Sequence, residues 1–161
     1  MIILPYDRSK AVQYARTWAL SRNPKYYDFS KIGGDCTSFV SQCIFAGSKT
    51  MNYTPVTGWY YNSLQSRSAS WSGVQYLYQF LTTNKGVGPF GTEARLSDLQ
   101  PGDVVQLGRE NGQFYHSLLI TQIKPTVLVC AHSDDAQDRR LESYDFYQLR
   151  ALQIQGVRKM K

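Results

Sequence analysis

One of the three cysteines in this 161-residue chain stands in a segment suited to nucleophilic chemistry. Cys36 directly follows Gly33-Gly34-Asp35, and an apolar run compatible with a helix begins after it. Glycine adopts backbone angles that are closed to other residues, so this pair suits a sharp turn into a helix. Unpaired amides at a helix start carry partial positive charge, which favours a thiolate over a thiol. Cys36 is therefore a candidate nucleophile, although the local pattern fits a buried, unreactive thiol equally well.

Both histidines stand at the ends of predicted strands. His116 opens one strand and His132 closes the next, and the turn at Lys124-Pro125 joins the two strands. Antiparallel neighbours place the start of one strand beside the end of the other, so we expect the two imidazoles at one edge of the sheet. One could take the proton of a thiol while the other orients it. Asp134 and Asp135 are alternative orienting groups, although they also suit a solvated loop.

The remaining cysteines point to the core rather than to a metal site. Cys43 lies two helical turns after Cys36, and Cys130 lies within an apolar strand. Their spacing fits neither zinc ligands nor a small disulfide framework. With two histidines in the whole chain, a structural zinc site is not expected. We expect reduced thiols and a reaction without metal or cofactor.

Composition restricts the classes of partner. The net charge of +6 implies attraction to anionic partners, such as wall polymers or acidic peptides, although the scattered basic residues favour the alternative of a solvated basic surface with a frayed tail. The basic residues are spread along the chain and no nucleic-acid motif occurs, so nucleic acid is not expected as a partner. Trp59 lies in the irregular segment 49–69 and is a candidate to line a substrate groove, because long loops in small domains are often functional. The alternative for that segment is a surface excursion that covers the core.

The elements that would position these residues fall into two halves. Helices are predicted over 8–22, capped by Asp7, over 36–46, and from 70–72 to about 84, whereas 87–91 is predicted as loop. Strands are predicted over 104–107, 115–123, 126–132 and 151–157, with a polar loop over 133–143. Helices followed by an antiparallel meander indicate an α+β fold, in which the cysteine helix packs on a small antiparallel sheet.

The chain is expected to form a single domain over residues 1–161. Met1 to Pro5 is too short for a signal peptide, and no apolar run is long enough to span a membrane. Either the protein is cytosolic, or the chain is a mature form or a domain of a longer secreted or cell-wall protein. The oligomeric state stays open.

Several runs resemble a known family. They are Tyr6-Asp7-Arg8-Ser9-Lys10-Ala11-Val12-Gln13-Tyr14-Ala15, Asn23-Pro24-Lys25-Tyr26, Gly33-Gly34-Asp35-Cys36-Thr37-Ser38-Phe39-Val40-Ser41-Gln42-Cys43, Pro101-Gly102-Asp103-Val104-Val105, His116-Ser117 and His132-Ser133. Together they resemble the putative amidase domains of Gram-positive bacteria. Those domains look like distant relatives of the NlpC/P60 and CHAP cysteine peptidases, which share a papain-like core. The chain departs from the family at Ser38, where asparagine is usual, and at Ser48, where a second glycine is usual.

The resemblance implies a reaction and a set of catalytic residues. It makes Cys36 the nucleophile, His116 the general base and His132 the third, orienting member of the triad. The implied activity is hydrolysis of an amide bond through an acyl-enzyme, with bacterial cell-wall peptide, such as that of peptidoglycan, as substrate. Two alternatives stay open. The same triad could transfer the acyl group to an amine, as an acyltransferase or transpeptidase does, or the chain could be a non-catalytic module that binds wall polymer or a partner.

The resemblance also implies substrate contacts. In NlpC/P60 enzymes the acid before the cysteine helps to hold a substrate amino group, and that position is Asp35 here. A tyrosine upstream of the cysteine lies near the active site in those enzymes, and Tyr27 or Tyr26 matches it.

Overall fold

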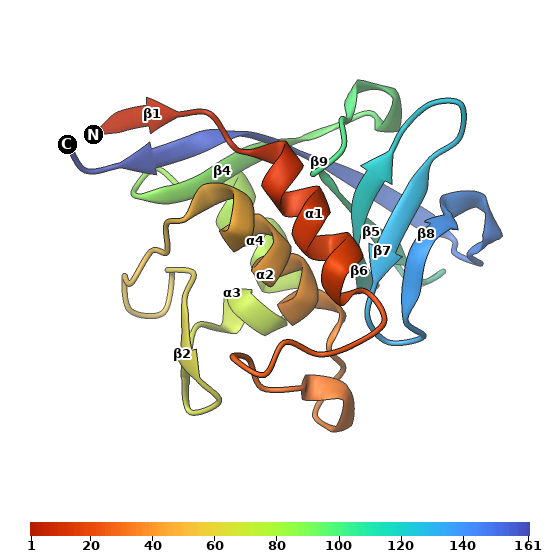
Figure 1. Ribbon diagram of the computed structural model, residues 1–161, viewed down its shortest axis with the longest axis horizontal. Helices are drawn as coiled ribbons and strands as arrows, with labels where there is room; N and C mark the ends of the chain where they lie inside the picture. Colours follow the sequence, from red (N-terminus) through yellow and green to blue (C-terminus); the bar gives the residue numbers. More distant parts are fainter.

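A seven-stranded antiparallel sheet and four α-helices make up the structure, a computed structural model that describes residues 1–161 (Figure 1). The helices are α1 (Arg8–Trp18), α2 (Cys36–Ser48), α3 (Ala69–Ser72) and α4 (Val74–Thr83). The strands of the main sheet are β1 (Ile2–Leu4), β4 (Gly88–Ala94), β5 (Val104–Gly108), β6 (Phe114–Gln122), β7 (Leu128–Ala131), β8 (Ala136–Arg140) and β9 (Gln148–Lys159). A separate ribbon consists of β2 (Tyr61–Ser63) and β3 (Ser66–Arg67). The predicted α+β class is confirmed.

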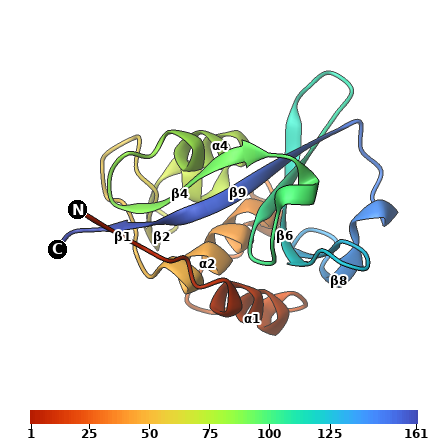
Figure 2. The same ribbon diagram turned by 90° about the horizontal axis from the view of Figure 1, so that it is seen from above.

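The long last strand, β9, is the centre of the sheet. The strand order is β1-β9-β5-β6-β7-β8, and β4 also pairs with β9. Leu152 of β9 stands opposite Val104 of β5 and opposite Glu93 of β4, so β4 occupies the other edge of β9. The ribbon of β9 runs through the whole molecule in Figure 2. The strand therefore links the meander β5–β8 to the N-terminal part of the chain.

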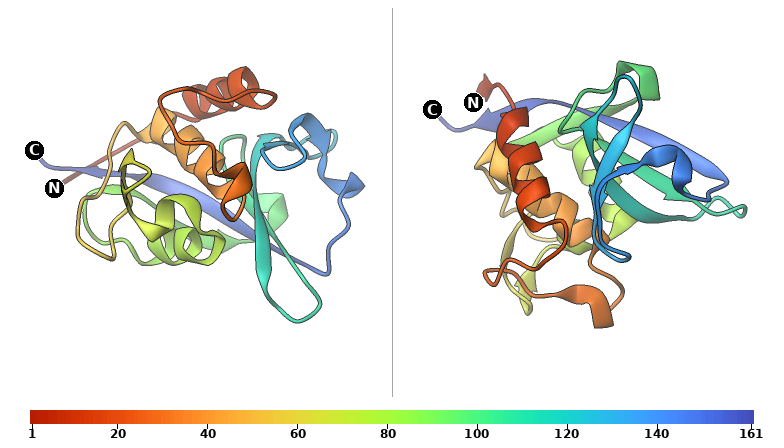
Figure 3. Two further views of the ribbon diagram at one scale, coloured as in Figure 1. Left: turned by 90° about the horizontal axis from the view of Figure 1, so that it is seen from below. Right: turned by 45° about the vertical axis from the view of Figure 1, so that its right-hand side comes forward.

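Two hydrophobic clusters lie on the two faces of the meander. Along β6, Leu119 belongs to a cluster shared with the helices, whereas Leu118 and Ile120 belong to a second cluster among the strands. Successive side chains of a strand point to opposite faces, which explains the division. In the right-hand view of Figure 3 the helices lie on one side of the strands β5–β8. Helix α2 is buried along almost its whole length, in agreement with its apolar sequence.

Local sequence explains where the helices begin and end. The Asp7 carboxylate accepts a hydrogen bond from the Lys10 amide at 3.1 Å, which confirms the predicted cap. Helix α1 ends at Trp18, four residues before the predicted end at 22. The third predicted helix is divided at Gly73, whose extended backbone separates α3 from α4. None of these helices combines the length and apolar character needed to cross a membrane.

Three strands were not predicted, and all three lie at edges of the sheet. The segment 87–91 was predicted as loop, but most of it belongs to β4, which pairs only with β9. A Cβ on Gly91 would lie 2.3 Å from the Gln153 carbonyl oxygen, so glycine permits this close pairing. Strand β8 occupies part of the predicted polar loop, and β1 pairs with the end of β9. Strands β4 and β8 contain mostly glycine and polar residues and lack the alternation that reveals a strand, whereas β1 has only three residues.

Candidate active site

Cys36 is the first residue of α2, as the sequence indicated. The preceding glycines have left-handed backbone angles, with φ of +80° at Gly33 and +100° at Gly34. Only glycine adopts such angles without strain, so the pair delivers the chain sharply into the helix. Asp35 occupies the N-cap position, but its side chain makes no capping bond to the helix. The Cys36 side chain is 7% exposed at the edge of the helix layer.

Burial dominates the electrostatics of the thiol. It raises the pKa of Cys36 above the ordinary value, and the negative charge of Asp35 adds to this effect. The backbone amide of Ser117 and the amide and hydroxyl of Thr37 act in the opposite direction, since they stabilise a thiolate. The helix start alone predicts a lowered pKa, but the loss of solvent outweighs it. Cys36 is therefore a neutral thiol at neutral pH in this structure.

A β-bulge positions His116 near the start of β6. Leu107 of β5 stands opposite His116, whereas the next residue, Gly108, stands opposite Phe114. Tyr115 is therefore the extra residue of the bulge, and its ring stacks at 6.3 Å from the imidazole. Bulges commonly reorient side chains beside functional sites.

The His116 imidazole is neutral and unengaged. Burial lowers its pKa to about 4, the Asp134 carboxylate acts to raise it, and the Arg139 guanidinium acts to lower it. No hydrogen bond within the protein contributes to that shift. A neutral imidazole without a protein partner keeps a lone pair that can accept a proton.

Cys36 and His116 are related through Ser117. The amide of Ser117 acts on the thiol, and His116 is the residue that precedes it on β6. The side-chain contact of the thiol is with the Thr37 hydroxyl at 3.7 Å. No hydrogen bond joins the thiol to the His116 imidazole in this structure, and catalytic hydrogen bonds often tighten only when substrate is bound.

His132 lies on the opposite face of the sheet from His116. The β6–β7 register pairs Leu119 with Cys130, and its continuation places His132 opposite Ser117 rather than His116. Cross-strand neighbours share a face, so the two imidazoles point away from each other. The strand ends do meet as expected, but His132 does not contact His116. The carboxylate that acts on His116 is Asp134, one of the two alternatives considered from the sequence.

Instead, His132 forms a buried pair with Asp35. Its Nδ1 lies 2.5 Å from the Asp35 carboxylate, and its Nε2 lies 2.8 Å from the Trp18 carbonyl oxygen. The ring stacks on Phe39 at 4.0 Å. Because a carbonyl oxygen only accepts, the hydrogen between His132 and Trp18 belongs to Nε2. A second hydrogen lies between Nδ1 and the Asp35 carboxylate. The pair ties the end of β7 to the loop that precedes Cys36.

Asp35 has little capacity left for a substrate. Its second oxygen accepts the Phe29 amide at 2.8 Å, the Arg22 guanidinium lies 3.6 Å away, and the side chain is 1% exposed. The expected contact with a substrate amino group is therefore not available in this structure. The carboxylate instead holds the turn that leads into α2.

The aromatic candidates occupy different places. Trp59 is fully buried, donates its indole N–H to Ser41 at 3.0 Å and stacks on Phe80, so it belongs to the core and not to a groove. Tyr26 packs on the core rings, including Trp71 at 5.8 Å. Tyr27 is half-buried, and its ring meets the edge of Phe29 in the loop before Cys36. Tyr26 and Tyr27 are both half-buried, and of the two it is Tyr27 whose ring contacts Phe29.

Two hydroxyl residues outside the set of candidates from the sequence adjoin the thiol. Thr37 and Ser117 are fully buried, and their oxygens lie 2.9 Å apart. Each directly follows a candidate catalytic residue, and each is a small polar residue inside an apolar run. A polar side chain in such a run must find a hydrogen-bond partner, which is the signal that could have drawn attention to them.

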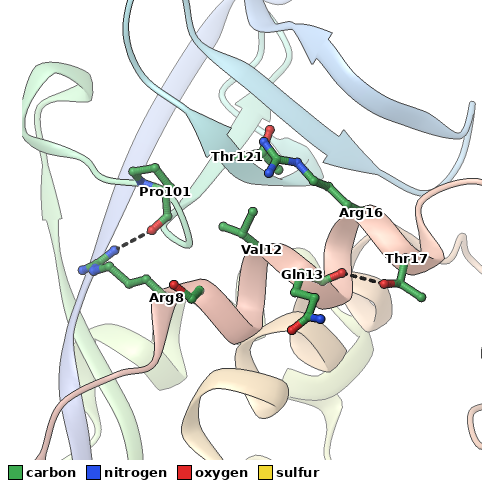
Figure 4. Close-up of a pocket in the computed structure, with 8 residues that line it drawn as sticks. Arg8, Val12, Gln13, Arg16, Thr17, Pro101 and Thr121 are labelled. Carbon is green, nitrogen blue, oxygen red and sulfur yellow. Dashed lines mark hydrogen bonds between the residues drawn. The ribbon is translucent and has the colours of Figure 1, made fainter.

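Two surface cavities differ in their relation to the site. The cavity in Figure 4 has a volume of about 650 Å³ and lies along α1 near Pro101 and Thr121. None of Cys36, His116 and His132 lines it. A second cavity, of about 460 Å³, is bounded by Tyr115, the neighbour of His116. Its lining is Gly108, Arg109, Glu110, Asn111, Tyr115, Asp145, Phe146 and Tyr147. No group of three or more His, Cys, Asp or Glu side chains converges to hold a metal ion.

Comparison with known proteins identifies relatives. A family model described as "Putative amidase domain" matches residues 5–154. "Uncharacterized protein YhbB" of Bacillus subtilis (strain 168) is 35% identical over 118 residues, which cover 71% of this chain and 37% of that protein. The chain thus matches little more than a third of the length of this relative. No solved structure matches the chain.

Proposed function

The chain belongs to the putative amidase domain family, and on that premise we propose that it hydrolyses an amide bond with Cys36 as nucleophile. The observation that best supports the proposal is the arrangement around Ser117. A cysteine at a helix start and a neutral, unengaged histidine on the adjoining strand flank the same backbone amide. Nucleophilic catalysis by cysteine needs such a base nearby.

In the proposed reaction, proton transfer accompanies attack. Both groups are neutral at rest, so the His116 imidazole takes the thiol proton as sulfur bonds to the carbonyl carbon. A backbone amide at the start of α2 stabilises the oxyanion. The C–N bond then breaks, the imidazolium gives its proton to the leaving amine, and a thioester remains. Water attacks the thioester with the same imidazole as base, which releases the acid and regenerates the thiol.

We assign the orienting role to Asp134 rather than to His132. Asp134 is the carboxylate whose charge favours the protonated form of His116. Asp135, by contrast, is paired with Arg22 at 2.8 Å. A carboxylate that favours an imidazolium assists general-base catalysis. A cysteine helix against an antiparallel strand that carries the base is also the arrangement expected of a papain-like core.

For the substrate we propose a peptide of the bacterial cell wall, the class that the family resemblance implies. The net charge of +6 favours anionic wall polymers as surroundings. The cavity next to Tyr115 offers aromatic surface beside His116, and Phe146 and Tyr147 line it as well. Aromatic rings supply contact area for peptide and other polar ligands alike.

The test compares purified wall fragments with unrelated peptides, and mass spectrometry identifies the products. The native protein should release a new amine and a new acid from wall fragments, and Cys36→Ala should release neither. Cys43→Ala is the control, because it removes a fully buried thiol in the same helix. Products at the native rate from Cys36→Ala would overturn the proposal. Added amine acceptors show whether the acyl group passes to water or to an amine.

A further inference from the structure

A continuous row of hydrogen bonds, part-buried at Arg150 and buried from Ser117 on, ends at the candidate nucleophile. The Arg150 Nε donates to Gln106 Oε1 at 2.8 Å, and the Gln106 Nε2 lies 3.0 Å from Ser117 Oγ. Ser117 Oγ lies 2.9 Å from Thr37 Oγ1, which lies 3.7 Å from the Cys36 sulfur. Gln106, Ser117 and Thr37 are fully buried, so water does not compete for these groups.

The first residue of the row is held rigidly. The Arg150 guanidinium lies over the Tyr78 ring at 3.7 Å and over the Phe114 ring at 3.9 Å. Its Nη2 also donates to Gln75 at 2.8 Å. A guanidinium that is stacked and hydrogen-bonded in this way keeps a fixed direction towards Gln106.

The directions of the bonds that Gln106 makes follow from its neighbours. Arginine only donates, so the amide oxygen of Gln106 must face Arg150. A carbonyl oxygen only accepts, so the amide nitrogen must face Val74, whose oxygen lies 3.0 Å away. The second N–H of Gln106 then donates to Ser117. Ser117 accepts from Gln106 and keeps its own hydrogen, which can go to Thr37, and the Thr37 hydrogen can then go to the sulfur.

We propose that Arg150, Gln106, Ser117 and Thr37 form a directional hydrogen-bond chain whose last hydroxyl donates to the Cys36 sulfur. Arg150, Gln106 and the Ser117 hydroxyl are positioning groups that act through another residue, whereas the Thr37 hydroxyl contacts the sulfur itself. The inference rests on the proposed function, because this hydrogen-bond chain serves catalysis only if Cys36 is the nucleophile.

The hydrogen-bond chain has two consequences for the site. The Thr37 hydroxyl stabilises the thiolate as it forms, because hydrogen bonds to charged acceptors are the stronger ones. The Thr37–Ser117 bond also fixes the cysteine helix against the strand that carries His116. The other groups that act on the sulfur are the Asp35 carboxylate, which disfavours the thiolate, and the amides of Thr37 and Ser117, which favour it.

The test measures the rate of alkylation of Cys36 by iodoacetamide as a function of pH, with mass spectrometry to resolve the modified cysteine. Thr37→Val removes the hydroxyl and keeps the shape. It should raise the midpoint of the profile by about one unit, so that alkylation below the midpoint is about tenfold slower. Thr37→Ser should restore the native midpoint. Ser117→Ala breaks the chain from the strand side and should raise the midpoint in the same direction.

Thr121→Val is the matched control, since its hydroxyl lies on the same strand but donates to Asp138. An unchanged midpoint in Thr37→Val, a uniform loss of rate at every pH, or an equal shift in Thr121→Val would each overturn the proposal. The profile requires no turnover. The alkylation test is therefore independent of the proposed function, which amidase activity retained by Cys36→Ala would refute.

Discussion

Removal of the Asp35 carboxylate should destabilise the protein strongly, because two buried groups depend on it. Asp35→Ala leaves His132 without its partner and the Phe29 amide without its acceptor. Asp35 and His132 are each 1% exposed, so water cannot replace the lost contact. Breaking a buried pair by removing one partner costs about 3–5 kcal/mol, a large share of a total stability of about 5–15 kcal/mol.

A conservative change at the same position should cost less. In Asp35→Asn the amide oxygen can still accept the Phe29 N–H, and the amide nitrogen can donate to Nδ1 of a neutral His132. We expect a loss of about 1–2 kcal/mol for this variant. Asp135→Ala is the control, because Asp135 forms a half-exposed ion pair with Arg22 whose loss should cost no more than about 1 kcal/mol.

The assay is urea unfolding at pH 7, followed by tryptophan fluorescence, for each variant and for a double-mutant cycle with His132→Ala. The double mutant should lose less stability than the sum of the single losses, by about 1–3 kcal/mol, because each single change leaves a buried group unpaired. Additive losses, or a loss below about 1 kcal/mol for Asp35→Ala, would refute the reasoning.

Three further predictions concern the site and the core. Burial lowers the pKa of His116 from 6.5 to about 4. Between these two pH values the unfolded chain binds a proton at His116 and the folded chain does not. The folded state therefore has its full stability above pH 6.5 and loses part of it as the pH falls towards 4. Urea unfolding at several pH values should show a loss of about 3 kcal/mol in the native protein that is absent in His116→Gln. Asp134→Asn should lower the pKa of His116 further in an NMR titration, while Asp135→Asn leaves it nearly unchanged, and equal shifts would contradict our assignment. Trp59→Phe should cost about 1–3 kcal/mol through loss of the Ser41 bond and of ring volume, without change in KM; a raised KM would return Trp59 to the substrate site.

The sequence carried the local features of the site. Asp7 and the glycine pair before Cys36 act through a few neighbouring residues, so their effects on helix starts could be predicted. The proximity of the two strand ends also followed from strand order. These features require no knowledge of packing.

The face on which each histidine lies could not be predicted. It depends on the β6–β7 register and on the bulge at Tyr115, and a shift of one residue exchanges the faces of a strand. The burial of Trp59 depends on its contacts with Trp71 and Phe80, which lie on later helices. Arg150 and Gln106 likewise meet only through the pairing of β5 with β9. Such contacts arise from the tertiary fold.

The pairing of β1 with the end of β9 has a consequence in polymer terms. Ile2 stands opposite Lys159, so the two ends of the described chain lie about 5 Å apart at that point, and Figures 1 and 2 both show them side by side. A short peptide linker could therefore join the ends with little strain in the folded state. Closing the ring lowers the conformational entropy of the unfolded state only. By chain statistics this stabilises the folded state by about 5 kcal/mol. Opening the ring between Leu64 and Gln65, in the turn of the β2–β3 ribbon, would give a circular permutant in which the strands β4–β9 precede Cys36.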